Sequence, residues 1–220
     1  MDTTKIEQLM PFWSDLEESE KEQVLKGCFE TTYKKGLLMH RCEQQCSGIM
    51  LILEGQLRTY IVSDEGREVT LFRVHKDDVC VLSATCLMDA IVFDVMIDAV
   101  EDTKVIMVPS AVLAPLMEKY PKIEAYLYKT AAERFSDVVW TMQQILFLSA
   151  DKRVAIFLWD EIARTNDMTI SATHEEIARY IGSAREVVSK VLKYFVQEGI
   201  VILERGKIRV MDKELLKKHL

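Results

Sequence analysis

Two consecutive helix-start signals, separated by one short turn, constrain the fold of this 220-residue chain more than any other feature. Thr173 and Glu176 place a hydroxyl at a predicted helix start and a carboxylate three residues later, the pattern called a capping box. Gly182 follows an apolar face at helical spacing and suits the left-handed conformation that ends a helix. Ser183 and Glu186 then repeat the capping box. These residues predict a helix-turn-helix.

The second predicted helix ends before Gly199 and has two distinct faces. Its apolar face, which we expect to be buried, comprises Val187, Val188, Val191, Leu192, Phe195 and Val196. Its polar face comprises Arg185, Glu186, Ser189, Lys190 and Lys193. Arg and Lys match the O6 and N7 acceptors of guanine, and Glu can accept from the N4 amine of cytosine, so this face is suited to the major groove of DNA. Because Glu186 also belongs to the second capping box, a structural role for it stays open.

Two β-rich runs follow this helix. They cover residues 200–203 and 208–210, with a turn at 204–207, and residues 168–170 are a candidate third strand. A capped amphipathic helix alone would indicate nothing more than surface packing. A helix-turn-helix followed by a β-ribbon predicts a winged helix.

These residues resemble the DNA-binding segment of the Crp/Fnr transcription regulators. In that family the recognition helix carries an Arg-Glu-x-x-x-Arg or Glu-x-x-Ser-Arg set that reads a G-A step in each half-site. The resemblance implies that the DNA-binding residues here are Thr173, Ser183, Arg185, Glu186, Ser189, Lys190 and Lys193. Lys190 stands where the family usually has Arg. Because Lys is a point charge rather than a planar fork, a weaker or differently oriented guanine contact is expected there.

The charge distribution is uneven. The chain carries a net charge of -7, but residues 1–150 have a balance of -9 and residues 151–220 a balance of +2. A mildly basic C-terminal part can meet phosphates, and an acidic N-terminal part would be repelled from the duplex, although chance alone can produce such a split. The start of the chain has no basic region before an apolar run, and no stretch reaches ~18 apolar residues. We therefore expect a cytoplasmic protein that does not enter a membrane.

The N-terminal two thirds predict a small β-barrel behind a helical lead-in. Residues 6–26 are expected to be helical, with a capping box at Ser19 and Glu22. From Phe29 to about Pro109, short β-rich runs alternate with turn residues, which predicts an antiparallel barrel. Its clearest hairpin joins residues 57–62 to residues 69–72 through a turn at 64–66.

A barrel of this size could instead be a metalloenzyme of the cupin type. That function needs several histidines and a carboxylate on one side of the barrel. The four histidines are His40, His75, His174 and His219, and no pair has ligand spacing. The chain also lacks a phosphate loop, a nucleophile elbow and paired catalytic carboxylates. We expect no metal site and no enzyme, and keep one rival function: a metal- or thiol-dependent β-barrel protein whose helical tail mediates assembly without binding DNA.

Residues 121–149 contain no Gly or Pro after Pro121 and predict one long helix. Its apolar residues at coiled-coil spacing are Leu127, Ala131, Phe135, Val138, Met142 and Ile145. A single buried helix would explain some of them, but a seam of about three heptads favours a symmetric dimer. Ser149 is a candidate cap for a further helix over 152–164, which puts a hinge near 146–151.

The resemblance to Crp/Fnr regulators extends to the barrel, including the run 36–40, and so covers essentially the whole chain. It implies an α+β fold with a sensor jelly-roll barrel over residues 1–120, a dimerisation helix over 121–149 and a winged helix-turn-helix domain over 150–220. It also implies a homodimer on palindromic double-stranded DNA, RNA polymerase as a partner, and control by a small-molecule or redox effector in the barrel.

The effector pocket implied by this resemblance contains Cys80, Leu82, Ser83, Cys86, Phe93, Asp94, Val138 and Val139. Members that bind cyclic AMP hold its phosphate with an Arg-Ser pair, and Phe93-Asp94 stands there instead. An anionic phosphate beside Asp94 would be a buried unpaired charge, which argues against cyclic AMP. No cysteine precedes Cys28, so the N-terminal cysteine cluster of the oxygen-sensing members is missing.

The five cysteines suit a reducing compartment in which thiols stay free, bind metal or sense oxidants. Cys80 and Cys86 are the candidates for redox sensing, and Cys42 and Cys46 lie four residues apart elsewhere in the barrel. The start of the Cys80 segment resembles the haem-binding segment of the family's carbon monoxide sensor, but Leu82 stands where that protein has a histidine ligand. No cofactor is required by the sequence, and a buried cysteine is most often a small apolar side chain.

Overall fold

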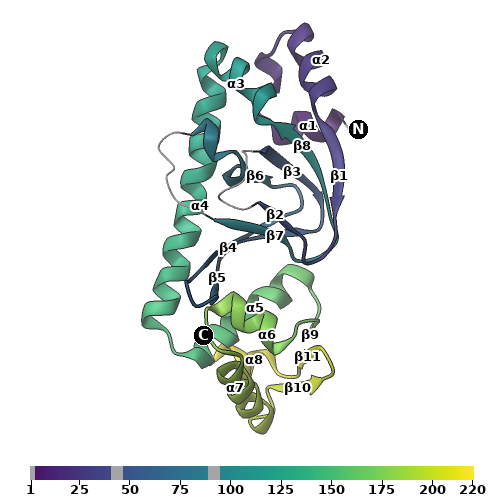
Figure 1. The fold of residues 1–220 in the computed structure, drawn as a ribbon. Coiled ribbons are helices and arrows are strands. Elements are labelled where there is room, and N and C mark those ends of the chain that lie inside the picture. The colour runs from purple at the N-terminus through teal and green to yellow at the C-terminus, as the bar shows by residue number, and fades with distance from the viewer. Residues whose placement is uncertain (1–2, 41–46, 89–94) are drawn as a thin grey trace. The chain divides into compact units, whose positions relative to one another are not determined.

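The computed structural model describes residues 3–40, 47–88 and 95–220. Its contacts divide the chain into two compact units, Met1–Ile61 with Leu71–Val138, and Val62–Thr70 with Val139–Leu220. Helices and strands both contribute, so the fold class is α+β as predicted (Figure 1). Every helix in the described ranges is too short or too polar to cross a lipid bilayer.

The helical lead-in has three pieces: α1 (Thr3–Leu9), a 3-10 turn η1 (Trp13–Asp15) and α2 (Glu18–Gly27). Their apolar side chains, among them Ile6, Met10 and Val24, are fully buried. The capping box of α2 is formed by Glu17 and Glu20. The box predicted at Ser19 and Glu22 is therefore wrong, because α2 begins at Glu18 and both of those residues already lie within it.

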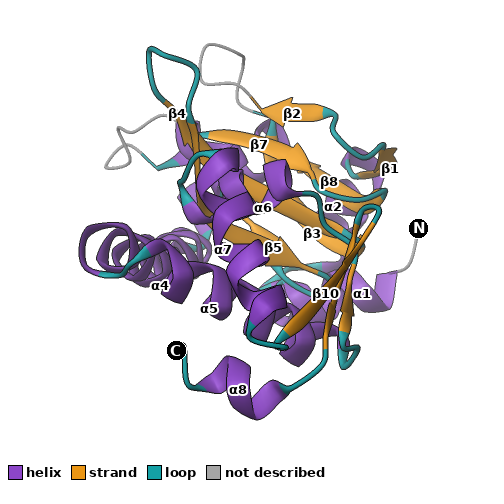
Figure 2. Ribbon diagram, turned by 90° about the horizontal axis from the view of Figure 1, so that it is seen from below, coloured by secondary structure: helices purple, strands orange, loops and turns teal. Residues whose placement is uncertain are grey.

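The barrel strands are β1 (Phe29–Tyr33), β2 (Leu38–His40), β3 (Gly48–Glu54), β4 (Gln56–Val62), β5 (Glu68–His75), β6 (Val79–Cys80), β7 (Met96–Ala99) and β8 (Thr103–Pro109). In the described part of the chain they form two sheets, ordered β1-β8-β3-β6 and β2-β7-β4-β5 (Figure 2). β4 and β5 are neighbours in the second sheet, so the predicted hairpin is confirmed. A short segment, η2 (Leu82–Leu87), follows β6.

Strand β3 is buried on both faces. Ile49 and Leu51 belong to the apolar cluster that includes the lead-in helices, whereas Met50 and Ile52 belong to the cluster between the sheets. Successive side chains of a strand point to opposite faces, so β3 contributes side chains to both clusters. The five consecutive apolar residues of β3 are the sequence pattern expected of such a strand.

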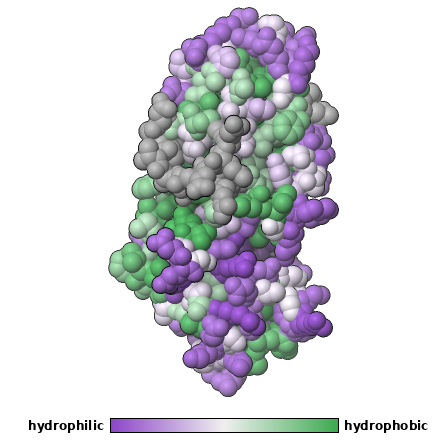
Figure 3. Space-filling model, in the orientation of Figure 1, coloured by the Kyte–Doolittle hydropathy of each residue, from purple (hydrophilic) through white to green (hydrophobic). Residues whose placement is uncertain are grey.

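Two helices follow the barrel, α3 (Ser110–Lys119) and α4 (Pro121–Phe147). The start of α4 is packed into the first unit, where Ile123 and Leu127 are fully buried. Further along α4, an exposed apolar stripe consists of Phe135, Val139, Met142 and Leu146, whose exposed fractions are 65%, 37%, 53% and 66%. Figure 3 shows hydrophobic residues gathered over this end of α4.

The exposed apolar stripe differs from the predicted seam. Leu127 lies in the core, and Ala131 and Val138 are partly buried against it. Phe135 and Met142 from the predicted seam, together with Val139 and Leu146, make the exposed stripe at steps of four, three and four residues. This spacing matches a heptad pattern on a second face of α4.

The C-terminal part contains α5 (Ala150–Thr165), β9 (Thr169–Ile170), α6 (His174–Ile181), α7 (Arg185–Gln197), β10 (Val201–Glu204), β11 (Lys207–Val210) and α8 (Lys213–Lys217). Ser149 is the N-cap residue of α5, as predicted. Side chains from all of the helices meet in one apolar core that includes Phe157, Ile177, Leu192 and Leu216. This core fixes the orientation of α6 and α7.

Candidate nucleic-acid interface

Helix α6 begins where the sequence predicts. Thr173 is its N-cap residue, and the Thr173 hydroxyl accepts a hydrogen bond of 3.1 Å from the backbone N–H of Glu176. In return, the Glu176 carboxylate accepts from the backbone N–H of Thr173 at 2.8 Å and from its hydroxyl at 3.0 Å. These bonds satisfy donors that the first turn of a helix leaves unpaired, which confirms the first capping box.

We predict that Thr173→Ala lowers the free energy of unfolding by ~1 kcal/mol, because it removes the side-chain acceptor of this cap. Urea denaturation of the purified protein measures the change. Thr173→Ser, which keeps the hydroxyl, is the matched control and should stay close to the wild type. Equal stability of all three proteins would show that the cap contributes nothing.

The turn between the helices is fixed by backbone geometry. Gly182 has φ = 61° and is the C-cap of α6, in the left-handed conformation that its lack of a Cβ permits. The N–H of Ser183 donates to the Ala178 carbonyl at 2.9 Å. Arg153 of α5 donates from Nη1 to the Ile181 carbonyl at 2.6 Å. The last carbonyls of α6 are therefore satisfied, and α7 starts in a defined direction.

The start of α7 differs from the prediction. The N-cap residue is Ala184, which has no side-chain acceptor, so the capping box predicted at Ser183 and Glu186 is wrong. Ser183 is instead part of the hydrogen-bonded turn that ends α6. Glu186 lies in the first turn of α7 and accepts no capping bond from Ser183. Its carboxylate is thus not used in the structural role that the sequence left open.

Helix α7 buries a narrower face than expected. Val188, Leu192 and Phe195 are buried, and Val191 packs partly against them. Val187 and Val196 are exposed, so predicting them as buried was wrong. The exposed side of α7 carries Arg185, Glu186, Lys190 and Lys193, with Ser183 and Ser189 partly exposed nearby.

The predicted ribbon is confirmed. β10 pairs antiparallel with β11, and β11 pairs with β9, so that the sheet order is β10-β11-β9. Ile208 and Val210 face the core, and Arg205 in the turn and Lys207 at the start of β11 are exposed. A basic turn next to a helix-turn-helix is the arrangement of a wing.

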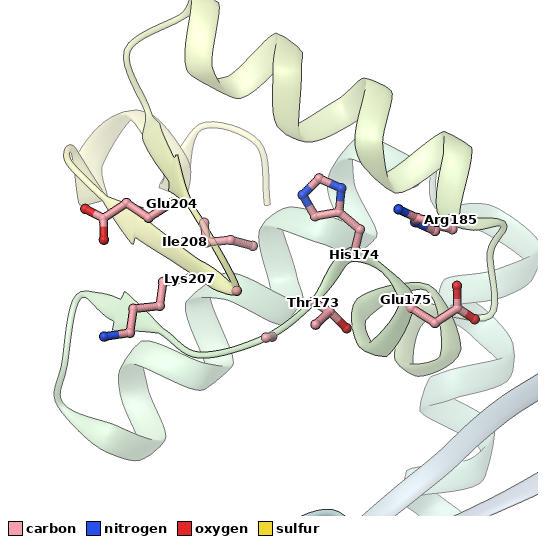
Figure 4. Close-up of a pocket in the computed structure, with 9 residues that line it drawn as sticks. Thr173, His174, Glu175, Arg185, Glu204, Lys207 and Ile208 are labelled. Carbon is pink, nitrogen blue, oxygen red and sulfur yellow. The ribbon is translucent and has the colours of Figure 1, made fainter.

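A groove of about 310 Å³ lies between the wing and the helix-turn-helix (Figure 4). It is lined by Ala172, Thr173, His174, Glu175, Arg185, Glu204, Gly206, Lys207 and Ile208. Figure 4 shows the His174 ring in this groove and the Arg185 side chain beside it, at the start of α7. Sequence reasoning named Thr173 and Arg185 but missed His174 and Lys207. The available signal was the position of His174 next to the helix cap.

Partial burial and two nearby cations act on the His174 imidazole. Desolvation is the largest cause that lowers its pKa below the ordinary 6.5, followed by the charges of Arg185 and Lys193. Each of these effects disfavours the protonated ring. His174 is therefore held neutral at neutral pH while DNA is absent.

The predicted effector-pocket residues are only partly brought together. Cys80 and Leu82 lie in the apolar cluster between the sheets, and Val138 packs against that cluster. The buried Ser83 hydroxyl donates to the Gly48 carbonyl at 2.7 Å. Val139 is exposed, and Phe93 and Asp94 lie outside the described residues.

The described residues do not fit a haem site like that of the carbon monoxide sensor. Cys80 and Leu82 are both packed in the apolar cluster, and a leucine offers no atom that binds iron. His75 of the barrel lies 2.8 Å through Nδ1 from the Gln56 amide nitrogen. Within the described ranges, no group of three or more His, Cys, Asp or Glu side chains could hold a metal ion.

The cysteines have different environments. Cys28 and Cys80 are buried free thiols, which is one of the predicted alternatives, whereas Cys86 is exposed and disulfide-bonded. Burial raises the pKa of Cys80, and it raises that of Cys28 to about 11. Cys42 and Cys46 lie outside the described residues.

We predict that iodoacetamide alkylates Cys80 of the folded protein much more slowly than in denaturant, because burial raises the pKa of this thiol and the thiolate is the reactive form. Peptide mass spectrometry after a timed reaction gives both rates, and Cys28 is the internal control. Fast modification of native Cys80 would show that its thiol is reactive in the folded protein and would support a redox-sensing role.

Comparisons with known proteins agree with this geometry. Residues 152–219 match the model of the Crp-like helix-turn-helix domain. The chain is 30% identical over 190 residues to the transcriptional activator protein FnrA of Stutzerimonas stutzeri, covering 81% of this chain and 75% of FnrA. It is 29% identical, with the same coverage, to the transcriptional activator protein anr of Pseudomonas aeruginosa. A crystal structure from Eubacterium rectale, assigned to transcriptional regulators of the crp/fnr family, superposes with a TM-score of 0.89 and 41% identity over 95% of this chain and 97% of that one.

Proposed function

Because this chain belongs to the Crp/Fnr family of transcription regulators, we propose that it binds an inverted-repeat DNA operator as a homodimer and places α7 in the major groove. The observation that carries the proposal is the exposed polar face of α7. That face presents basic side chains beside a basic wing, on a helix whose other side is fixed in the core. Two such helices in a symmetric dimer would enter successive major grooves about 34 Å apart.

The side chains of this interface divide into two roles. Arg185 and Lys190 are proposed to contact guanine, and Glu186 the cytosine paired with it. Ser183 and Ser189 contact phosphate or base edges, and Thr173 and Lys193 contact phosphates. Two observations support these roles. The charged side chains of the set are exposed. The Glu186 carboxylate is not held in a capping box with Ser183, so it is available to contact a base.

The exposed apolar stripe of α4 supports the homodimer. Phe135, Val139, Met142 and Leu146 would remain in water in a monomer, and contiguous exposed apolar patches mark interaction sites. The same spacing on a second copy would let the two stripes pack against each other about a two-fold axis. We propose that this pairing sets the distance between the two recognition helices.

Control would come through the barrel. We propose that the effector is not cyclic AMP, because the Ser83 hydroxyl is bonded to a backbone carbonyl, Leu82 is packed in an apolar cluster and Val138 packs against that cluster. Redox control and a small apolar effector remain the two proposals for the signal. As a regulator, the protein would act in the cytoplasm, where it reaches the chromosome and RNA polymerase, and would catalyse no reaction.

Fluorescence anisotropy with a labelled duplex at several salt concentrations tests the DNA-binding role. We expect the logarithm of the association constant to fall linearly with the logarithm of the salt concentration. The reason is that cationic side chains of the protein displace counterions from the DNA phosphates. Metal analysis of the same sample distinguishes a DNA-binding regulator from the rival function, a metal-dependent β-barrel protein. Bound metal in stoichiometric amount, together with no affinity for duplex DNA at low salt, would favour a metal-dependent barrel protein over a regulator.

A further inference from the structure

The groove beside α7 is suited to an anion. It is lined by residues at the N-terminal ends of both α6 and α7, where the helix dipoles carry partial positive charge. Two cationic side chains of α7, Arg185 and Lys193, act on the His174 ring in this groove. The groove also lies next to the exposed face of α7, so a duplex bound there would bring its phosphates close to His174.

Two acidic side chains, Glu175 and Glu204, line the groove, whereas the first-turn carboxylates of Glu176 and Glu186 do not. Glu175 is 3.5 Å from the guanidinium of Arg179 in an ion pair, and its carboxylate points away from the His174 ring (Figure 4). On the wing, the charged ends of Glu204 and Lys207 are both directed away from that ring. The charges that act on the imidazole are therefore the two cations of α7.

We propose that a DNA phosphate enters this groove and that His174 takes up a proton as it does, so that the protein binds duplex DNA more tightly as the pH falls. The inference rests on the proposed DNA-binding function and assigns a pH-dependent contact to it. Proton transfer is from solvent to the imidazole, and a protonated ring then donates a charge-assisted hydrogen bond to the phosphate.

The sign of the effect follows from the two states of the histidine. In the free protein, burial and the two cations lower the pKa of His174 below 6.5, so the ring is neutral at pH 7. A phosphate within hydrogen-bonding distance favours the charged ring and raises the pKa in the complex. The complex therefore holds more protons than the free protein between these two pKa values, and the dissociation constant falls as pH is lowered through that window.

The test measures anisotropy of a labelled duplex of about 30 base pairs, enough for two half-sites, from pH 8 to pH 6 at constant ionic strength. We expect the wild type to bind at least about tenfold more tightly at the acidic end, since each His174 that takes up a proton can contribute up to a tenfold change per pH unit. His174→Gln should bind with little pH dependence, at the affinity the wild type has near pH 8. His174→Arg should bind tightly at every pH.

His219→Gln is the matched control. This histidine lies in the same part of the chain, packed against the rings of Phe195 and Tyr194, and does not line the groove. Its variant should keep the wild-type pH dependence. Calorimetric titrations in buffers of different ionisation enthalpy count the protons taken up on binding, and thermal unfolding checks that each variant is folded.

The outcomes separate the inference from the function it rests on. Duplex binding that keeps the same pH dependence in His174→Gln, or a wild type with no proton uptake, would overturn the role of His174 and leave DNA binding intact. No binding by the wild type at any pH would overturn the proposed function and this inference with it. A pH dependence lost in His174→Gln and kept in His219→Gln supports the proposal.

Discussion

Replacing Phe135 and Met142 with glutamate is expected to convert a dimer into monomers. Both side chains belong to the exposed apolar stripe of α4, and two charges per helix would repel their counterparts across a two-fold axis. Affinity for an inverted repeat should fall by about 10²–10⁴, because a monomer loses the advantage of binding two linked half-sites. Sedimentation equilibrium gives the mass, and anisotropy with the duplex gives the affinity.

The matched control is Ser136→Glu with Gln143→Glu. These residues are also exposed, lie one position further along α4 and have the same spacing of seven, but they are not in the exposed apolar stripe. The control should remain a dimer and bind DNA like the wild type. A tight dimer in the Phe135 and Met142 variant would place the subunit interface elsewhere.

Changing Arg185 and Glu186 to alanine is expected to alter which sequences the protein prefers. Arg185→Ala should weaken the free energy of binding to the preferred operator by about 1–3 kcal/mol per half-site. The loss should be much smaller for operators in which the guanine proposed to contact Arg185 has been replaced. Glu186→Ala should relax the preference at one base pair per half-site by a similar amount. Competition binding against a set of single-base-pair operator variants measures both effects.

Lys207→Ala on the wing is the control for this pair of variants. An exposed lysine that contacts only phosphate should weaken binding to all sequences alike and reduce the salt slope by about one. Glu186 is not held by a capping box, so its removal should leave the helix folded. If Glu186→Ala lowered affinity uniformly and α7 also lost helicity by circular dichroism, its role would be structural.

Local signals predicted the ends of α6 well. Thr173 and Glu176 are reciprocal partners within four residues, and Gly182, which has no Cβ, adopts φ = 61° without strain. The box at Ser183 and Glu186 had the same sequence pattern and was wrong. Since Ser183 donates its N–H to Ala178 to end α6, the start of α7 moves to Ala184. A capping pattern cannot reveal that a neighbouring helix already uses the residue.

Periodicity predicted the existence of α4 better than the orientation of its faces. An apolar residue at helical spacing can pack into its own unit or remain outside, and spacing alone does not distinguish the two. Leu127 is buried in the first unit, whereas Phe135 and Met142 from the same predicted seam are exposed. The groove around His174 could not be predicted for a related reason, since its walls come from three separate segments that range from Ala172 to Ile208.

If two copies of α7 read an inverted repeat, selection from a pool of random duplexes should recover that repeat. The wild-type protein is incubated with the pool, bound duplexes are recovered and amplified, and the enriched sequences are read. We expect an inverted repeat whose half-site centres are about 10 base pairs apart, with a G·C pair in each half-site whose preference is lost with Glu186→Ala. Enrichment of a single unrepeated site, or no enrichment above the starting pool, would contradict it.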